Sequence, residues 1–272
     1  MKKFFMLSNE EIKRSFKLYL SILTMLVIVE LTSVVYQVLH YQSKLEDLMK
    51  KERLTEMEAV DQLNGPLTFG DATNYFKYMI AIGIMFTILY AFQIWYRDWY
   101  GESKYIYRLL MLPGKRITIL LSKLTTVLVF VCGFMGIQWI TILLSRRLYE
   151  WLLPEHLQAA SKIIGESAAL NMLYTFNVID TFVILALALF VITMVFLFVL
   201  TERSYQKGKA LLTITKDVAL LIVPFIALRY LFDLTSILIP NQQVFVYLSF
   251  ILIYFAYISW KCVRLLNHKV SI

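Results

Sequence analysis

Six runs of predominantly apolar residues set the strongest constraint on how this chain can fold. Each run has about the 20 residues that an α-helix needs to cross the hydrocarbon core of a bilayer. Hydrophobic residues make up 59% of the chain, against roughly 45–50% in soluble domains. The sequence therefore predicts an all-α integral membrane protein in which residues 1–272 form a single transmembrane domain. The predicted spans cover approximately residues 17–39, 75–95, 118–144, 180–201, 218–239 and 244–262.

The basic residues are distributed unevenly between the segments that flank the spans. Lys and Arg concentrate in four segments that a six-span chain places on one side: 1–17, 96–123, 202–217 and the tail from Lys261. The segments on the opposite side carry more acidic than basic residues. By the positive-inside rule, both termini are predicted to be cytoplasmic, and we expect a multi-pass protein of the cell membrane. The net charge of +8 then reflects contact with lipid head groups, and the scattered basic residues do not indicate a nucleic-acid partner.

The N-terminal residues are predicted to form a surface helix ahead of the first span. Ser8 followed by Glu11 has the pattern of a capping box, which indicates that a helix begins there. We therefore expect a short amphipathic helix over residues 8–17 at the cytoplasmic surface of the membrane. On the opposite side, the three- and four-residue spacing of apolar residues within 40–74 predicts a second amphipathic helix.

The sequence lacks the residue patterns that several kinds of chemistry require. The chain has no G-x-x-x-x-G-K-[ST] phosphate-binding loop, so any ATP must be bound by another chain. Cys132 and Cys262 lie far apart in apolar runs, and no histidine has a second ligand at metal-site spacing. We therefore expect no catalytic residue, metal or cofactor on this chain. An intramembrane enzyme is the least favoured interpretation, because the spans lack a set of acidic and histidine residues.

Three ionisable residues lie at or near membrane depth in the predicted spans. Glu30 falls near the middle of the first span, where a carboxylate costs roughly 2.5–3.5 kcal/mol to insert. On the functional interpretation it faces a polar cavity or bonds a neighbouring span. The alternative is a neutral, protonated or locally paired carboxylate that only tolerates its site. Arg229 and Asp233 are one helical turn apart, so they can pair on one face of the fifth span or line the path. Pro224 predicts that this span is broken or enters the membrane only part-way.

A short basic segment between the second and third spans has the pattern of a docking element. From Ser103 the chain can form an amphipathic helix, which Pro113 and Gly114 end. This short helix, which we call the stub, is too small to form an active site. A soluble partner can bind it and transmit a conformational change to the two spans. The alternative interpretation is an ordinary inter-span loop. The candidate residues of the stub are the apolar Ile106, Leu109 and Leu110, the charged Glu102, Lys104 and Arg108, and the boundary residues Pro113, Lys115 and Arg116.

The same segment resembles the permease subunit of a type-2 ABC transporter. The resemblance rests on Gly101-Glu102 after the second span, a short helix, the sequence LPGKR at 112–116, and Ser122-Lys123. Six spans, an N-terminal surface helix and a tail directly after the last span extend the resemblance over the whole chain.

The resemblance implies a partner that binds nucleotide. Permeases of this family pair with a second permease, either a copy or a paralogue. They dock cytoplasmic ATPase subunits, which bind ATP and Mg²⁺, through helices like 8–17 and 103–112. On this interpretation the nine stub residues above couple the chain to the ATPase, and Glu30, Arg229 and Asp233 are candidates for the translocation path. The implied cargo of such an exporter is a lipid, peptide, glycan or drug-like molecule. A non-transporting assembly or sensory subunit is the alternative function.

Overall fold

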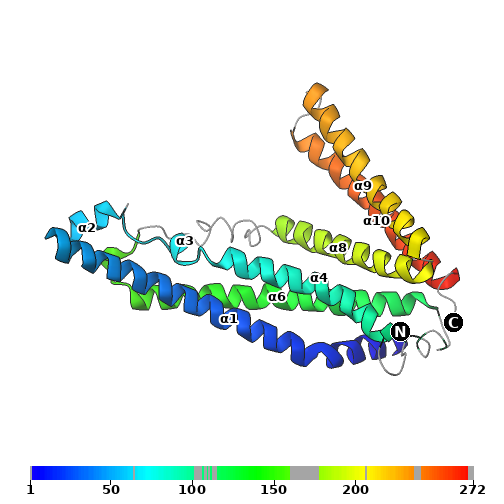
Figure 1. The fold of residues 1–272 in the computed structure, drawn as a ribbon, viewed down its shortest axis with the longest axis horizontal. Helices are drawn as coiled ribbons and strands as arrows, with labels where there is room; N and C mark the ends of the chain where they lie inside the picture. The colour runs from blue at the N-terminus through cyan, green and yellow to red at the C-terminus, as the bar shows by residue number, and fades with distance from the viewer. Residues whose placement is uncertain are drawn as a thin grey trace. The chain divides into compact units, whose positions relative to one another are not determined.

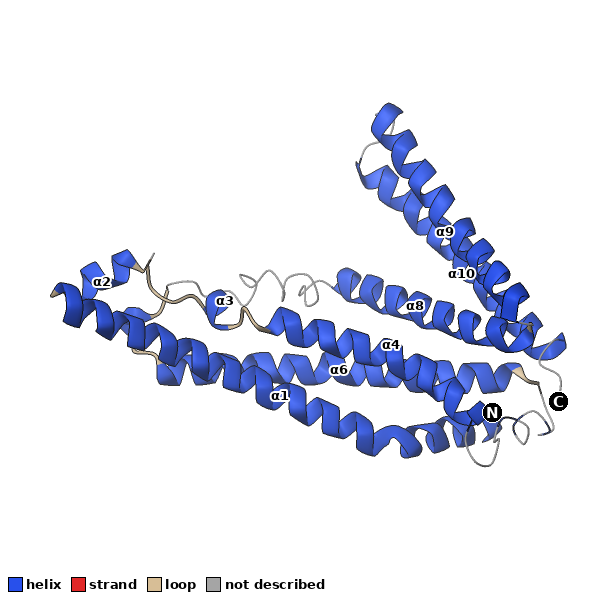
Figure 2. Ribbon diagram, viewed as in Figure 1, coloured by secondary structure: helices blue, strands red, loops and turns tan. Residues whose placement is uncertain are grey.

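The part of the chain that the structure describes is mainly helical, with short loops between some of the helices (Figure 2). This structure, a computed structural model, describes residues 2–63, 65–100, 106, 109, 111, 115–159, 178–205, 207–235 and 240–268. Within these residues no strand is present, apart from an isolated bridge between Leu67 and Gln158. The elements, labelled in Figure 1, are α1 (Lys2–Glu52), α2 (Glu56–Gln62), α3 (Phe69–Ala72), α4 (Phe76–Tyr100), α6 (Ile117–Leu152), the 3₁₀-helix η1 (Glu155–Leu157), α8 (Val178–Ser204), α9 (Lys207–Thr235) and α10 (Pro240–His268).

Six of the described helices are long and apolar enough to cross a membrane, which confirms the predicted number of spans. They are α1, α4, α6, α8, α9 and α10. Each extends beyond its predicted apolar run at one end or at both. The reason is that an apolar run identifies only the part of a helix that lies in the hydrocarbon core of the bilayer. The helix itself continues until capping or turn residues end it.

Helix α1 is one continuous helix of 51 residues, and this corrects the predicted N-terminus. The sequence predicted a separate helix over 8–17 that begins at Ser8, but α1 begins at Lys2 and passes through that range without a break. Ser8 is buried inside the helix, and the Glu11 carboxylate binds other helices, so the predicted capping box does not form. The physical reason is that no Gly or Pro occurs before residue 65, so nothing breaks the helix.

Contacts divide the chain into two compact units. Unit 1 comprises Met1–Glu11, Ile88–Val127 and Ala188–Ile272, and unit 2 comprises Ile12–Thr87 and Leu128–Leu187. In unit 2, parts of α1, α4 and α6 lie side by side, and the short elements α2, α3 and η1 pack with the ends of α1 and α6 around a buried core (Figure 1). We call these short elements and helix ends the capping layer.

Two tyrosine hydroxyls form hydrogen bonds from the long helices α1 and α6 to the loop between α2 and α3. The Tyr41 hydroxyl on α1 donates to the Gly65 carbonyl at 3.1 Å, and the Tyr149 hydroxyl on α6 donates to the Leu67 carbonyl. Gly65 has a φ of 102°, a left-handed conformation that glycine adopts without steric cost.

The predicted helix within 40–74 is present as two pieces, the end of α1 and α2, with the chain turning at Arg53 between them.

Two glycines bring the helices of unit 2 close together. Gly83 on α4 faces the ring of Phe134 on α6, and Gly133 on α6 faces the Tyr19 hydroxyl on α1. A Cβ atom at either glycine would overlap the facing side chain. Small residues at helix crossings matter in lipid, because apolar burial gives no driving force between helices there and close packing has to hold them together.

In unit 1, α9 and α10 form an antiparallel pair held by a buried carboxylate. Asp217 on α9 is 2% exposed, and both of its carboxylate oxygens accept hydrogen bonds from the Lys261 ammonium on α10. The Tyr257 hydroxyl donates to the same carboxylate at 3.2 Å, and the Tyr254 hydroxyl donates to the Asp217 backbone carbonyl. The sequence analysis did not single out any of these residues.

The prediction that the fifth span is broken is wrong. Helix α9 runs from Lys207 to Thr235 with Pro224 inside it. Proline removes one backbone donor from a helix. The apolar residues on either side of Pro224 keep their backbone hydrogen bonds, because an unsatisfied backbone group is costly in hydrocarbon. Pro240 is the first residue of α10, a position where its missing N–H would have no partner in any case.

Candidate functional site: a buried ion cluster beside the inter-span stub

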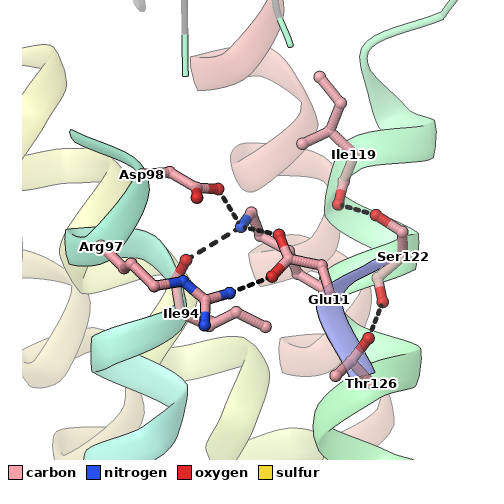
Figure 3. Close-up of polar contacts among 8 residues, drawn as sticks. Glu11, Ile94, Arg97, Asp98, Ile119, Ser122 and Thr126 are labelled. Carbon is pink, nitrogen blue, oxygen red and sulfur yellow. Dashed lines mark hydrogen bonds and ion pairs between the residues drawn. The ribbon is translucent and has the colours of Figure 1, made fainter. Parts of the chain in front are cut away.

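Lys123 is the centre of a buried ion cluster in unit 1. The residue lies on α6 and its side chain is 1% exposed. Its ammonium donates to Glu11 Oε1 of α1 at 2.8 Å, to the Ile94 carbonyl of α4 at 2.9 Å and to the Asp98 carboxylate of α4. Figure 3 shows these three oxygens turned toward one nitrogen. A lysine ammonium has three donors, and here all three are used.

Among the described residues, the cluster contains equal numbers of carboxylates and cations. The second carboxylate oxygen of Glu11 accepts from the Arg97 guanidinium on α4 (Figure 3). Two carboxylates thus face two cations, and the Glu11, Asp98 and Lys123 side chains are each at most 6% exposed. Pairing of this kind is what allows charges to be buried, since an isolated buried charge is far more costly. The ring of Trp95 also lies 5.1 Å from the Lys123 ammonium, within the range of a cation–π contact.

The helical repeat explains how α4 supplies this site. Ile94 and Asp98 are four residues apart, so the carbonyl of one and the carboxylate of the other lie on the same face of the helix. On α6, the Ser122 hydroxyl donates to the Ile119 carbonyl and the Thr126 hydroxyl donates to the Ser122 carbonyl. These hydroxyls therefore bond within their own helix and do not compete for the ammonium.

A second contact joins α8 to the last turns of α4. The Arg203 guanidinium lies 4.3 Å from the Tyr100 ring centroid, 5.4 Å from that of Tyr96 and 5.9 Å from that of Trp99. The neighbouring Glu202 accepts a hydrogen bond from the Tyr96 hydroxyl. The end of α8 is therefore attached to α4 directly before the predicted stub begins.

Part of the predicted stub lies within the described residues. Ile106 and Leu109 are helical and buried, at 0% and 3% exposed, whereas Met111 is helical and 67% exposed. Lys115 is exposed, and the Arg116 guanidinium donates to the Leu266 carbonyl of α10 at 2.7 Å. The other predicted stub residues, Glu102, Lys104, Arg108, Leu110 and Pro113, lie outside the described residues.

Of the three translocation-path candidates, Glu30 belongs to unit 2, and Arg229 and Asp233 belong to unit 1. Glu30 is 0% exposed and accepts a hydrogen bond from Gln138 on α6 at 2.7 Å, a contact that fits both the functional and the structural interpretation of this residue. Arg229 is exposed on α9, and the side chain of Asp233 lies outside the described part of the chain. The predicted Arg229–Asp233 pair therefore stays a prediction.

Sequence reasoning found one member of the ion cluster and missed its partners. Lys123 entered through the Ser122-Lys123 pair, whereas Glu11 was assigned to a capping box and Arg97 and Asp98 were not singled out. A usable signal was present, because Lys123 lies inside the third predicted span and so requires a buried carboxylate partner.

The fold and the site define a multi-pass helical membrane protein with a buried ion cluster at one end of its first three spans. Within the described residues no group of three potential metal ligands occurs. No protein-family model matches the chain, and neither a curated protein nor a solved structure is significantly similar to it. The assignment of a function therefore depends on the residues themselves.

Proposed function

We propose that this chain is the permease subunit of a type-2 ABC transporter and that it exports an amphipathic substrate. Both termini lie in the cytoplasm on this proposal, and the protein resides in the cell membrane. A separate ATPase subunit binds ATP and Mg²⁺ and docks beneath the stub, whose candidate residues lie within 102–116. A second permease, a copy or a paralogue, completes the transporter.

The observation that carries the proposal is the position of the ion cluster. Residues 101–114 are flanked by the end of α4, with Arg97 and Asp98, and by the start of α6, with Lys123. The Glu11 carboxylate joins both of these helices to α1. The buried ion cluster at the base of this element holds α1, α4 and α6 together, and an element that transmits force needs such a connection.

Two further contacts extend this connection to other helices. Arg203 attaches α8 to the last turns of α4, and Arg116 attaches the residue just before α6 to the end of α10. A displacement of the stub is thereby passed to five helices of unit 1. Closure of the ATPase subunits biases one of two arrangements of the spans, which is how binding energy drives alternating access.

The described stub residues divide into two roles on this proposal. Ile106 and Leu109 are buried in this chain and hold the stub in place, whereas the exposed Met111 faces the partner. The sequence analysis placed Ile106 and Leu109 among the nine residues that couple the chain to the ATPase, and their burial supports a positioning role for these two.

Co-purification tests the proposal directly. The chain, extracted in mild detergent from its native membrane, should carry a bound ATPase subunit whose hydrolysis is stimulated by the permease. The substitution Met111→Asp should reduce capture of that subunit several-fold without changing insertion. The matched control is Met57→Asp in the capping layer, where Met57 is 83% exposed and no loss is expected. If no ATPase subunit can be co-purified or crosslinked, the proposal is wrong, and the non-transporting subunit becomes the better interpretation.

A further inference from the structure

Glu30 and Gln138 form an isolated polar pair between α1 and α6. Both residues are 0% exposed. Gln138 Nε2 donates to Glu30 Oε1 at 2.7 Å. The remaining two oxygens, Glu30 Oε2 and Gln138 Oε1, are buried and have no hydrogen-bond partner among the described residues. The pair thus contains two adjacent functional groups, each with one acceptor unsatisfied.

The surroundings of the pair offer no compensating cation. One turn away along α1 are the buried Leu26 and Val34, and one turn along α6 is the buried Ile142. The neighbouring Thr141 hydroxyl already donates to the Ile137 carbonyl at 3.0 Å. Among the described residues, no lysine, arginine or histidine is within ion-pair distance of Glu30.

An ionised Glu30 would leave this arrangement poorly satisfied. Its charge would be met by a single amide N–H, and two buried acceptors would lack donors, each of which is costly in an apolar environment. Protonation of Glu30 Oε2 supplies the missing donor, because a protonated carboxyl group has an O–H. That O–H can donate to Gln138 Oε1 while Gln138 Nε2 donates to Glu30 Oε1.

We propose that Glu30 and Gln138 form a proton-binding site, in which a neutral carboxylic acid and a carboxamide exchange two reciprocal hydrogen bonds. The ligand is a proton taken from water when α1 and α6 meet. The carboxylate that gains it becomes neutral, so no other charge has to enter the site. The protonated pair holds α1 and α6 together with two hydrogen bonds, whereas the ionised pair keeps only the bond from Gln138 Nε2. This inference is independent of the transporter proposal.

Infrared spectroscopy of the full chain in lipid vesicles tests the inference. The wild-type chain should show a carbonyl band of a protonated carboxylic acid that shifts in heavy water, and this band should be absent from Glu30→Gln. The matched control is Glu46→Gln, because Glu46 is an exposed carboxylate paired with Lys50 and its substitution should leave the band in place. If wild type and Glu30→Gln have the same spectrum in the acid region, Glu30 is ionised and the inference is wrong.

A second variant tests the reciprocal geometry. Gln138→Leu removes the amide, so the acid band should remain but move to the higher frequency of a carboxylic acid without a hydrogen-bond partner. Glu30→Gln should retain the wild-type melting temperature, since two amides can also exchange two hydrogen bonds. An unchanged band position in Gln138→Leu would overturn the proposed pairing, even if Glu30→Gln were to fail to insert.

Discussion

The Lys123 ammonium lies 2.8 Å from Glu11 Oε1, although the two residues are 112 positions apart in the chain. This contact joins the beginning of α1 to the beginning of α6, and Asp98 brings α4 into the same cluster. Each participant is buried, so each depends on the others for its charge to be tolerated. The cluster is therefore a place where one substitution should have a large effect.

Substitution of the cluster's central lysine should destabilise the protein strongly. Lys123→Met leaves the carboxylates of Glu11 and Asp98 without their shared ammonium, and removing one partner of a buried ion pair costs about 3–5 kcal/mol. We expect a clearly lower melting temperature in detergent or nanodiscs. The control is Lys50→Met, which removes only the exposed i,i+4 pair with Glu46. Equal stability of the two variants would contradict the role of the cluster.

Asp217 should control the packing of α9 against α10. Asp217→Ala leaves the Lys261 ammonium without its carboxylate, and we expect a loss of about 3–5 kcal/mol. The two native cysteines provide the measurement, because Cys262 on α10 is buried and Cys132 is exposed. A membrane-permeant maleimide should label Cys262 much faster in the variant and Cys132 at the same rate as before. Tyr254→Phe removes one hydrogen bond, so its effect should be about 0.5–1.5 kcal/mol.

The glycine at the crossing of α4 and α6 should resist enlargement. In Gly83→Ala the added methyl group overlaps the Phe134 ring, and such overpacking costs about 1–3 kcal/mol. Gly136 on α6 is the matched control, because nothing lies within 4 Å of its Cβ position. Gly136→Ala should be neutral or stabilising by up to about 1 kcal/mol, since alanine is the better helix former. Similar melting temperatures for the two variants would rule out a close α4–α6 approach at Gly83.

The capping layer should respond to acid through Glu58. The Thr55 backbone N–H donates to the Glu58 carboxylate at 2.9 Å and the Thr55 hydroxyl donates to it at 2.7 Å, which lowers the pKa of Glu58. A carboxyl whose folded pKa is lowered stabilises the fold above its unfolded pKa, about 4.3 for Glu, and this contribution is lost as the pH falls through the folded pKa. Unfolding measured from pH 7 down to pH 3 should show a shallower pH dependence in Glu58→Gln than in wild type.

Cysteine labelling should establish the orientation on which the proposed function depends. In a background without Cys132 and Cys262, Lys115→Cys should react with an impermeant maleimide only after the cells are opened. Met57→Cys should react on intact cells, because Met57 and Lys115 are both exposed and belong to opposite sides of the predicted topology. The reverse pattern would place the stub outside and contradict an ATPase partner.

The spans could be predicted from the sequence, but the ends of the helices could not. Runs of about 20 apolar residues have one stable environment, the bilayer, so their number was correct. Helix α1 is continuous from Lys2 to Glu52 because it contains no Gly or Pro, and hydropathy does not report this; the Ser8–Glu11 pattern therefore predicted a helix start that does not exist.

The candidate site could be predicted only in part, because its contacts are long-range. Lys123 was identifiable from a local sequence pattern. The partner of Lys123 is set by which faces of α1 and α6 meet. No local pattern contains that information, so Glu11 could not be chosen. Glu30 shows the same limit: its burial cost indicated that it needs a partner, but Gln138 could not be chosen from among the polar residues of the other spans.

The position of Lys123 along the chain has a consequence for biosynthesis. Glu11 and Asp98 are translated before the ammonium that neutralises them. A nascent chain that stops short of residue 123 therefore cannot complete the junction of its first two spans. Growing chains should therefore remain exposed to quality-control proteases until the start of α6 has left the ribosome, and chains truncated before residue 123 should remain so permanently.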